Sequence, residues 1–238
     1  MLSDLEQGGY ILLNKPYTWT SFQATKKVQY VLKRHFGVKK VKIGHAGTLD
    51  PLATGLLILC VGKYTKRIEE YQAGEKEYTG TIFLGATTPS FDKEKPVDCT
   101  FPVNHISEDA IRQTASSFLG EQMQVPPVFS AVKINGVRAY AKAREGKEVK
   151  MRERPITIHE FEITDIRMPE VDFRIRCSKG TYIRSIARDF GLRLQSGAYL
   201  TALCRTRIGD MRLEDAKTPE QIQAMFPIKP EASLSPAE

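Results

Sequence analysis

The sequence predicts an α+β fold, a mixed α/β chain with a largely antiparallel central sheet flanked by helices and loops. Three observations support this prediction. Segments with strand and helix periodicity alternate irregularly, several turn signals join neighbouring strands, and no run of βαβ units occurs. The chain has 238 residues, of which 41% are hydrophobic, and this is enough to bury a substantial core.

In the N-terminal half, the strands are predicted from apolar runs and the helices from capping residues. A helix is expected from the N-cap candidates Thr20-Ser21 to Gly37, a second over Thr65–Gln72, and a third from Ser107 to Gly120. The predicted strands are Tyr10–Asn14, ending at Lys15-Pro16, then Leu56–Val61 and Glu77–Leu84.

In the C-terminal half, turn signals separate the predicted elements. Asn135-Gly136 marks a tight turn, and Met168-Pro169 joins two strands in an antiparallel pair. The predicted strands are Val128–Lys133, Ile156–Ile166, Val171–Cys177 and Ala198–Ile208. The predicted helices are a short basic one over Arg138–Arg144, one over Thr181–Leu194, and a last one that starts at the capping-box sequence from Thr218. We expect one domain over residues 1–215 and a short helix with a frayed tail over 216–238.

The charge of the chain favours a polyanionic partner. Lys and Arg number 35 against 28 Asp and Glu, which gives a net charge of +7. Seven cations and no acid occur between Phe22 and Leu49, which favours a phosphate-facing surface over an ordinary solvated helix face. A second segment, Lys133–Arg154, carries eight cations and three acids.

Several classes of protein are disfavoured by what the sequence lacks. The four cysteines include no CxxC pair, so we expect buried thiols in a reducing cytosol. The N-terminus has no signal-peptide pattern, and the longest apolar run is too short to span a bilayer. Neither a dinucleotide nor a Walker phosphate motif occurs, and the four histidines lack metal-ligand spacing. No metal, cofactor or membrane partner is expected.

The stretch GHAGTLDPLATGLLIL, Gly44–Leu59, raises the main functional question. Its single acid, Asp50, precedes Pro51, and Asp-Pro commonly starts a turn. On spacing alone, Asp50 is therefore better explained as a turn residue. Tyr78, on a predicted strand, and Tyr182 with Arg184, at a predicted helix start, add aromatic and basic groups suited to a catalytic site.

The same stretch resembles, almost letter for letter, the signature of the TruB family of bacterial tRNA pseudouridine-55 synthases. Four further blocks agree with that family in the same order, from about Gly9 to about Gly209. They are Leu12–Pro16 with Thr20-Ser21, Tyr78 in its strand, Ser130–Lys133 with Gly136 and Tyr140, and Cys177–Arg184. The resemblance implies a pseudouridine-synthase catalytic fold, here without a C-terminal PUA-type domain, and an RNA-clasping thumb over about 125–154.

The resemblance also implies roles for individual residues. Asp50 is expected to be the catalytic carboxylate, Tyr78 to stack on the target uracil and act in proton transfer, and Arg184 to pair with Asp50. Substrate-binding roles are expected for the remaining candidates: Tyr182 and Leu203 line the uridine pocket, His45 contacts the RNA where the nucleotide is flipped out, Lys15 shapes the edge of the site, and Lys133 belongs to the thumb.

The chemistry expected for the family suits these residue types. Turning uridine into pseudouridine breaks the N1–C1′ bond and joins C1′ to C5, so nothing is oxidised and no cofactor is required. A carboxylate can attack the sugar or the base, or take a sugar proton through a glycal-like intermediate. The sequence leaves these routes open. The expected partner is the T-arm stem-loop of tRNA, modified at position 55 by a cytoplasmic monomer without a guide RNA.

Two departures from the family pattern bear on function. Many relatives carry Thr-Asp-Thr-x-Asp after the Tyr78 strand, whereas this chain reads Thr88-Pro89-Ser90-Phe91-Asp92, so a loop-ordering or arginine-pairing role at position 89 is in doubt. Without the C-terminal domain of many relatives, we expect a weaker grip on the acceptor arm and unchanged chemistry. Three alternatives remain: an RNA-binding or RNA-folding module without catalysis, a base-releasing glycosidase, and a guide-RNA-dependent relative.

Overall fold

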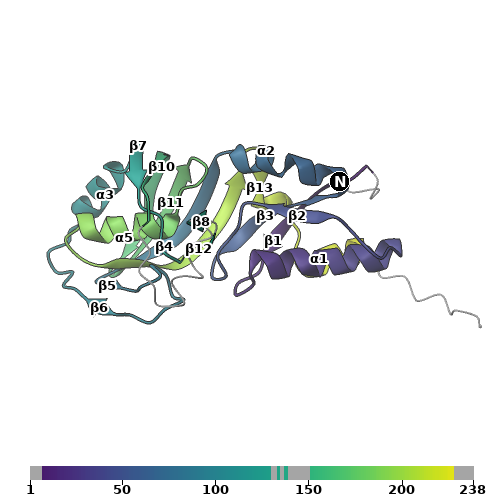
Figure 1. Cartoon of the computed structure of the whole chain (residues 1–238). Coiled ribbons are helices and arrows are strands. Elements are labelled where there is room, and N and C mark those ends of the chain that lie inside the picture. The colour runs from purple at the N-terminus through teal and green to yellow at the C-terminus, as the bar shows by residue number, and fades with distance from the viewer. Residues whose placement is uncertain (1–6, 130–132, 135–136, 139–150, 228–238) are drawn as a thin grey trace, which may run out of the picture. The chain divides into compact units, whose positions relative to one another are not determined.

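The computed structural model describes residues 7–129, 133–134, 137–138 and 151–227. Contacts divide the chain into two compact units, one formed by the residues up to Gly74 together with those from Arg205 on, the other by Glu75–Cys204. Strand β12 (Ala198–Ile208) contributes residues to both units. Figure 1 shows helices and strands mixed along the chain, as expected for an α+β fold.

The first unit is a sheet covered on both faces. Its elements are β1 (Gly9–Lys15), α1 (Ser21–Phe36), β2 (Ile43–Ala46), β3 (Thr54–Val61), the 3-10 helix η1 (Gly62–Arg67), α2 (Ile68–Ala73), the end of β12, β13 (Met211–Arg212), η2 (Leu213–Asp215) and α6 (Pro219–Met225). Strand β3 pairs antiparallel with β1 and β2 and neighbours β12, while β13 pairs with β12.

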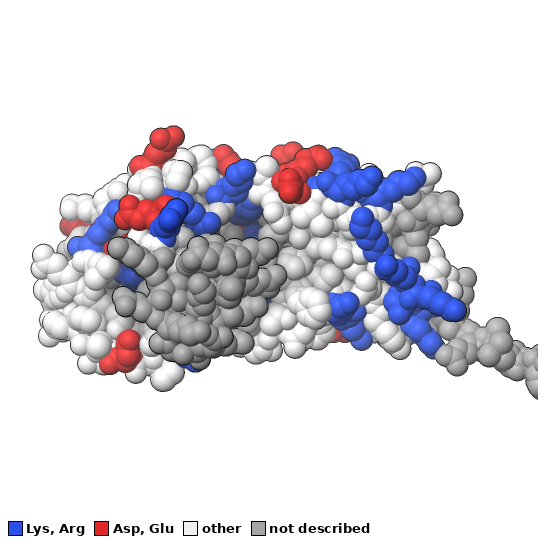
Figure 2. Space-filling view, viewed as in Figure 1, with Lys and Arg blue, Asp and Glu red and all other residues white. Residues whose placement is uncertain are grey.

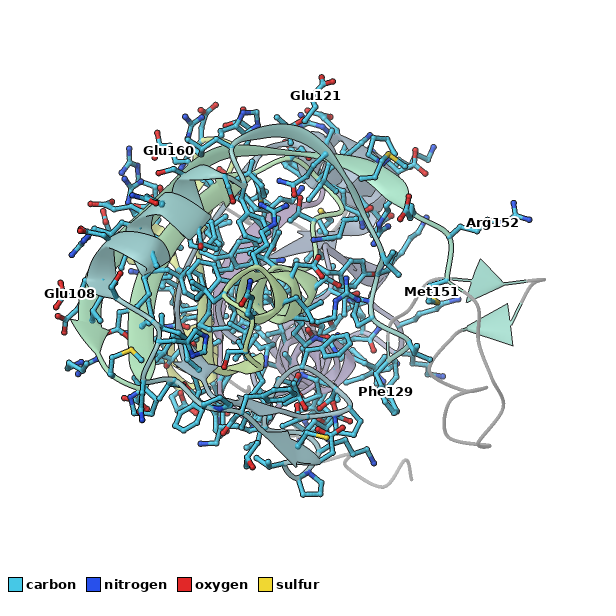
Figure 3. The ribbon with its side chains drawn as sticks, turned by 90° about the vertical axis from the view of Figure 1, so that its left-hand side faces the viewer. Glu108, Glu121, Phe129, Met151, Arg152 and Glu160 are labelled. Atoms are coloured by element: carbon cyan, nitrogen blue, oxygen red, sulfur yellow. The ribbon has the colours of Figure 1, made fainter. Side chains whose placement is uncertain are left out.

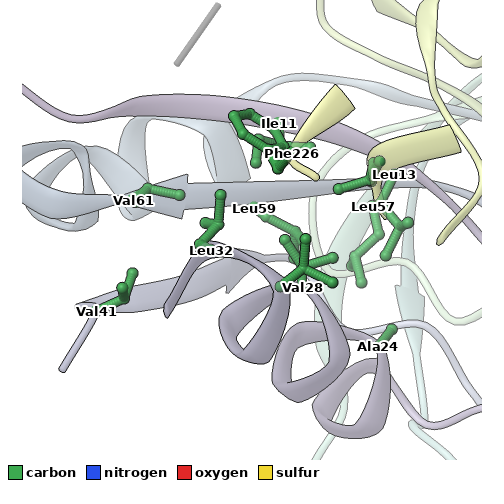
Figure 4. Packing of buried hydrophobic residues seen from close by; sticks show 12 residues of the cluster. Ile11, Leu13, Ala24, Val28, Leu32, Val41, Leu57, Leu59, Val61 and Phe226 are labelled. Carbon is green, nitrogen blue, oxygen red and sulfur yellow. The ribbon is translucent and has the colours of Figure 1, made fainter. Parts of the chain in front are cut away.

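Strand β3 is the centre of this unit, because its residues from Gly55 to Val61 are all buried. On one face Leu57, Leu59 and Val61 pack with Ile11 and Leu13 of β1 against α1 (Figure 4). On the other face Leu56, Ile58 and Cys60 contact side chains of η1 and α2. A strand buried on both faces needs a continuous apolar run, which is what the sequence has there.

Helix α1 begins and ends where its sequence predicts. Thr20 is the N-cap: its hydroxyl accepts the backbone N–H of Gln23, and the Gln23 side chain reaches back to the Thr20 backbone, completing a capping box. Gly37 ends the helix in the left-handed region with φ 65°, where glycine carries no Cβ penalty. Helix α6 has the same device at Thr218, and Phe226 just beyond it is buried in the first unit's core.

The second unit is an antiparallel sheet with helices on one face. In chain order it contains β4 (Lys76–Leu84), β5 (Ala86–Thr87), β6 (Cys99–Thr100), α3 (Glu108–Ser116), β7 (Gly120–Gln124), β8 (Lys133–Ile134), β9 (Val137–Arg138), β10 (Arg154–Arg167), β11 (Glu170–Cys177), α5 (Ile183–Arg193) and the start of β12. The sheet order is β12-β4-β11-β10-β7, and β10 and β11 form the hairpin expected at Met168-Pro169.

The core of the second unit lies between α3, α5 and the sheet. Phe161 and Phe173 of the sheet, Phe118 after α3 and Phe190 of α5 form a cluster of stacked, tilted and edge-on rings, with neighbouring centroids 5.6–6.2 Å apart. The alternation of β11 places its apolar residues on this side and its polar residues on the other. Figure 3 shows α3 and α5 over the sheet, with Glu108 and Glu160 on the side away from Phe129 and Met151.

Several sequence predictions are wrong at this level. Strands β2 and β7 were not expected, and Gly120 begins β7 where the sequence predicts only a helix stop. Val128 and Phe129 form a bend and no strand, and Arg138 lies in β9, where the start of a basic helix was predicted. The rest of that predicted helix, Ala139–Arg144, lies outside the described residues. Cys60 and Cys177 are buried as expected, whereas Cys99 is exposed and Cys204 half-buried.

Candidate active site

The predicted site residues divide between the two units, and each group is described within its own unit. Lys15, His45 and Asp50 belong to the first unit. Tyr78, Lys133, Tyr182, Arg184 and Leu203 belong to the second. The expected pairing of Asp50 with Arg184 therefore remains a prediction.

Asp50 lies between β2 and β3. The segment from Gly47 to Leu56, which includes the first three residues of β3, is here called the Asp50 loop. Its carbonyl oxygen accepts the N–H of Ala53 at 3.1 Å, so Asp50 opens a tight turn through Pro51. The turn interpretation of the sequence is therefore correct for the backbone. Leu49 and Ala53 on either side are buried, at 4% and 2% exposure, which anchors the turn to the core of the first unit.

Two side chains hold the residues directly before and after Asp50. The Ser21 hydroxyl donates to the Leu49 carbonyl at 3.0 Å and accepts the Leu49 N–H at 2.8 Å. The Lys15 ammonium donates to the Pro51 carbonyl at 3.3 Å and to the carbonyls of Pro16 and Trp19. The backbone of Asp50 is thus held from α1 on one side and from the end of β1 on the other.

Lys15 is fully buried, and its environment changes its acidity. Burial lowers the pKa of Lys15 to about 8, the negative charge of Asp50 opposes this, and the positive charge of Arg205 adds to it. A buried cation close to Asp50 fits the expected role of Lys15 at the edge of the site.

His45, on β2, is held by two threonines. Its Nδ1 lies 3.4 Å from the Thr25 hydroxyl and its Nε2 3.2 Å from the Thr48 hydroxyl. The Thr25 hydroxyl donates to the Ser21 carbonyl at 2.7 Å, so toward His45 it acts as an acceptor and the imidazole proton is assigned to Nδ1. Burial and the charge of Arg205 lower the pKa of His45, which keeps the ring neutral near pH 7.

In the second unit, Tyr78 and Leu203 lie on strands. Tyr78 is on β4 opposite Ile175 of β11, on the same side of the strand as Ile82, and only 8% of it is exposed. Leu203 is half-buried on β12. Lys133 lies on β8, paired with Arg138 of β9, within the predicted thumb. Figure 3 shows Phe129 and Met151, which flank the thumb's central part, on the same side of this unit.

Tyr182 is fixed by two residues that the sequence did not single out. The buried Gln124 side chain accepts the Tyr182 N–H at 2.8 Å and donates to the Tyr182 carbonyl at 3.1 Å. The guanidinium of Arg154 lies over the Tyr182 ring, 4.4 Å from its centroid. Gln124 and Arg154 face each other in the pairing of β7 with β10, so one pair of strands holds both the backbone and the ring of Tyr182.

Arg184 is buried, with 3% of its side chain exposed, in the first turn of α5. Its guanidinium lies 3.6 Å from the Asp92 carboxylate and donates to the carbonyls of Ser90 and Phe129. Asp92 thus supplies an acidic partner for arginine although position 89 is proline. Thr88 and Ser90 donate to the Asp92 carbonyl, so this loop is also ordered by its own side chains.

Neither a metal site nor a membrane span is found in the described part of the chain. No group of three or more His, Cys, Asp or Glu side chains among residues 7–129 and 151–227 is arranged to hold a metal ion. No helix there is long and apolar enough to cross a bilayer.

Comparison with known proteins assigns the chain to one family of enzymes. Residues 33–183 match the family model described as TruB family pseudouridylate synthase, N-terminal domain. The chain is 56% identical over 211 residues to tRNA pseudouridine synthase B of Flavobacterium johnsoniae, covering 88% of this chain and 92% of that protein. It is 53% identical over 224 residues to the protein of the same name from Bacteroides thetaiotaomicron, covering 92% and 93%.

Solved structures share the fold. The crystal structure of a Cbf5-Nop10-Gar1 complex matches with a TM-score of 0.68 and 28% identity, over 92% of this chain and 54% of that one. An H/ACA RNP bound to a substrate RNA containing 2′-deoxyuridine matches with a TM-score of 0.65 and 26% identity, over 92% and 53%. This chain therefore spans about half the length of those two chains. With a family model covering more than half of it and relatives above 50% identity matched along nearly their full length, the chain belongs to the TruB family of pseudouridylate synthases.

Proposed function

We propose that this enzyme converts uridine to pseudouridine in the T-loop of tRNA, at position 55, with Asp50 as the catalytic carboxylate. The observation that supports this assignment best is the Asp50 loop itself, in which Ser21 and Lys15 fix the residues on both sides of a single acid. A carboxylate held by its backbone is pre-organised to meet a reacting atom. The relatives' shared name, tRNA pseudouridine synthase B, supports tRNA as the substrate.

Base flipping explains why the site needs aromatic residues. The target uridine lies inside a folded loop, and extruding it costs a few kcal/mol. Stacking on an aromatic ring returns about 1–3 kcal/mol per base. We assign this stacking to Tyr78, and the lining of the uridine pocket to Tyr182 and Leu203. His45, neutral and held by Thr25 and Thr48, is assigned to the RNA backbone at the flipped nucleotide.

The rearrangement itself moves one glycosidic bond. The N1–C1′ bond breaks and its electron pair stays on N1, the uracil turns, C1′ joins C5, C5 loses its proton to solvent, and N1 takes up a proton, so the product is an isomer of the substrate. Asp50 acts by attacking C1′ or C6, or by taking a sugar proton to give a glycal-like intermediate, and each route uses one ionised carboxylate. Arg184, held in place by Asp92, is assigned as the cation that pairs with Asp50.

The basic surface of the first unit is assigned to tRNA phosphates. Figure 2 shows Lys and Arg side chains gathered over the first unit, which Figure 1 draws around α1. Lys26, Lys39, Lys40 and Lys42 of this unit are exposed. The enzyme is proposed to act in the cytoplasm as a monomer, without a guide RNA, and the thumb that contains Lys133 is proposed to clasp the RNA.

The test compares the native protein with Asp50→Asn and Asp50→Glu on a T-arm stem-loop. Asparagine keeps the size but removes the charge, and glutamate keeps the charge but displaces it. We expect no pseudouridine from either variant, with RNA affinity unchanged within about threefold. Pseudouridine formed by Asp50→Asn would refute the assignment of Asp50 as the catalytic carboxylate. RNA binding by the native protein without any pseudouridine would favour an RNA-binding module. Free uracil in the native reaction would instead indicate a glycosidase.

A further inference from the structure

Arg205 is a buried cation that the sequence analysis did not single out. It lies on β12, within the part of that strand belonging to the first unit, beside β3 (Figure 1). Only 1% of it is exposed, which makes it one of the largest fully buried side chains in the described part of the protein. Burying a guanidinium is costly unless its donors are satisfied, and Arg does not lose its proton in proteins.

The guanidinium binds both ends of the Asp50 loop. Its Nε donates to the Leu56 carbonyl at 2.8 Å, and its Nη2 donates to the Gly47 carbonyl at 2.9 Å. These two N–H groups lie on one edge of a rigid planar fork, so the two bonds fix the carbonyls relative to each other. Gly47 lies against this fork with φ +88°, and a Cβ added there would lie 3.5 Å from Nη1.

Together with Ser21 and Lys15, Arg205 holds the backbone on both sides of Asp50 in the sequence. Ser21 holds Leu49, Lys15 holds Pro51, and Arg205 closes the loop at Gly47 and Leu56. The charge of Arg205 also reaches the neighbouring site residues, because it lowers the pKa values of both Lys15 and His45. Arg205 therefore acts on all three candidate site residues of the first unit. It holds the loop that carries Asp50, and its charge acts on Lys15 and His45.

We propose that Arg205 is a positioning residue for catalysis: its two-point hold on Gly47 and Leu56 fixes the direction in which the loop presents the Asp50 carboxylate. The inference rests on the proposed catalytic role of Asp50. It predicts that the reaction rate depends on the geometry of the Arg205 guanidinium as well as on its charge. A displacement of about 1 Å at a reacting group can cost about 100-fold in rate.

The test uses Arg205→Lys and Arg205→Met, with Arg207→Met as the matched control. Lysine keeps the charge but offers a single ammonium, which cannot reproduce the parallel bonds of the fork. Arg207 lies two residues along the same strand and donates to Gly209, outside the Asp50 loop. Single-turnover rates at saturating RNA, RNA dissociation constants and thermal midpoints are measured for the native protein and for each variant.

We expect both Arg205 variants to lose about 100-fold in single-turnover rate, with RNA affinity within about threefold of native, and Arg207→Met to stay within about threefold in both. A core variant, Val31→Ala, shows what lost stability alone does to the rate. If Arg205→Lys retains the native rate, or if Val31→Ala with an equal drop in thermal midpoint loses as much, the proposal is overturned.

Hydrogen exchange gives a readout that does not depend on activity. The Ala53 N–H is bonded to the Asp50 carbonyl, so its protection reports on the turn. Protection should fall in Arg205→Lys and in Gly47→Ala, which disturbs the same contact from the loop side, and should persist in Arg207→Met. Unchanged protection in both would overturn the proposal. If the variants show these exchange changes but the native protein forms no pseudouridine, the proposed function is refuted, while the hold of Arg205 on the Asp50 loop stands.

Discussion

Lys15 shows how a single buried side chain links the acid–base chemistry of the protein to its stability. Its pKa is about 8 in the folded protein against 10.5 for an ordinary lysine. Between these values the unfolded chain binds a proton that the folded chain has released, so the free energy of unfolding rises with pH over this window. This is the sign expected of a base whose folded pKa is lowered.

The prediction is that native protein gains stability relative to Lys15→Met as pH is raised from about 7.5 to about 10. Urea unfolding of both proteins at several pH values in this range measures the difference. A difference that stays constant across the range would show that Lys15 keeps its ordinary pKa in the fold.

At Tyr182 the important contacts come from Gln124. Gln124→Ala removes two hydrogen bonds to the Tyr182 backbone at the start of α5. Each such bond is worth about 1 kcal/mol, so we expect a fall of about 10- to 30-fold in the rate of pseudouridine formation. Gln122→Ala on the same strand is the control, since its amide donates to Phe118 instead. Equal rates for the two variants would show that Gln124 does not position Tyr182 for the reaction.

At the scale of elements, the polar face of the second unit's sheet carries a network of ion pairs. Arg174 contacts Glu77, Glu160 and Glu162, and Arg176 contacts Glu75 and Glu160. The hydrogen bonds from Arg176 and Arg174 lower the pKa of Glu160. The contribution of Glu160 to stability is therefore fully present at pH values above its unfolded pKa near 4.5. It is lost as pH falls through the lower pKa of the folded protein.

Glu160→Gln should accordingly lower the urea midpoint at neutral pH, by a small amount because these groups are near solvent. The difference from native should shrink in high salt, and it should also shrink as pH falls below about 4.5, where Glu160 becomes protonated. Glu121→Gln, on the edge strand β7, serves as the control and should change little at either pH. A difference that persists in acid would mean that Glu160 acts by packing and not by charge.

The elements also show what sequence reasoning can reach. Helix α1 and strand β3 were predictable because capping residues and a long apolar run act locally, from Thr20 to Gly37 and from Leu56 to Val61. Strand β2 was missed because its four residues, Ile43–Ala46, have no alternation and are set by pairing with β3. Strand β7 was missed because a polar edge strand looks like a loop.

The residues of the candidate site also fall into a group that the sequence predicts and a group that only the fold reveals. Asp50, Tyr78, Tyr182 and Arg184 were found through their motifs, which are local in sequence. Ser21, Gln124 and Arg205 were not identified as site residues, because they act through contacts with positions 28, 58, and 149 or 158 residues away. A buried arginine and a buried glutamine look like surface residues in a sequence, and only the fold reveals what their donors bind.

At the scale of the whole molecule, the distribution of charge governs RNA binding. The lysines between α1 and β2 are exposed, and phosphate contacts release counterions when they form. We expect Lys39→Gln/Lys40→Gln to weaken tRNA binding and to lower the slope of log affinity against log salt by about 1 to 2. Arg167→Gln is the control, since Arg167 pairs with Asp165 and Asp172. An unchanged slope would mean that these lysines do not contact phosphate.

The central claim is that this chain alone isomerises one uridine of tRNA. The most direct measurement incubates the purified native protein with an unmodified full-length tRNA transcript, adds no other RNA, and maps every pseudouridine formed. We expect a single pseudouridine, in the T-loop at position 55, and none with Asp50→Asn. A product that requires a second RNA, a modification elsewhere in the transcript, or no pseudouridine at all would contradict it.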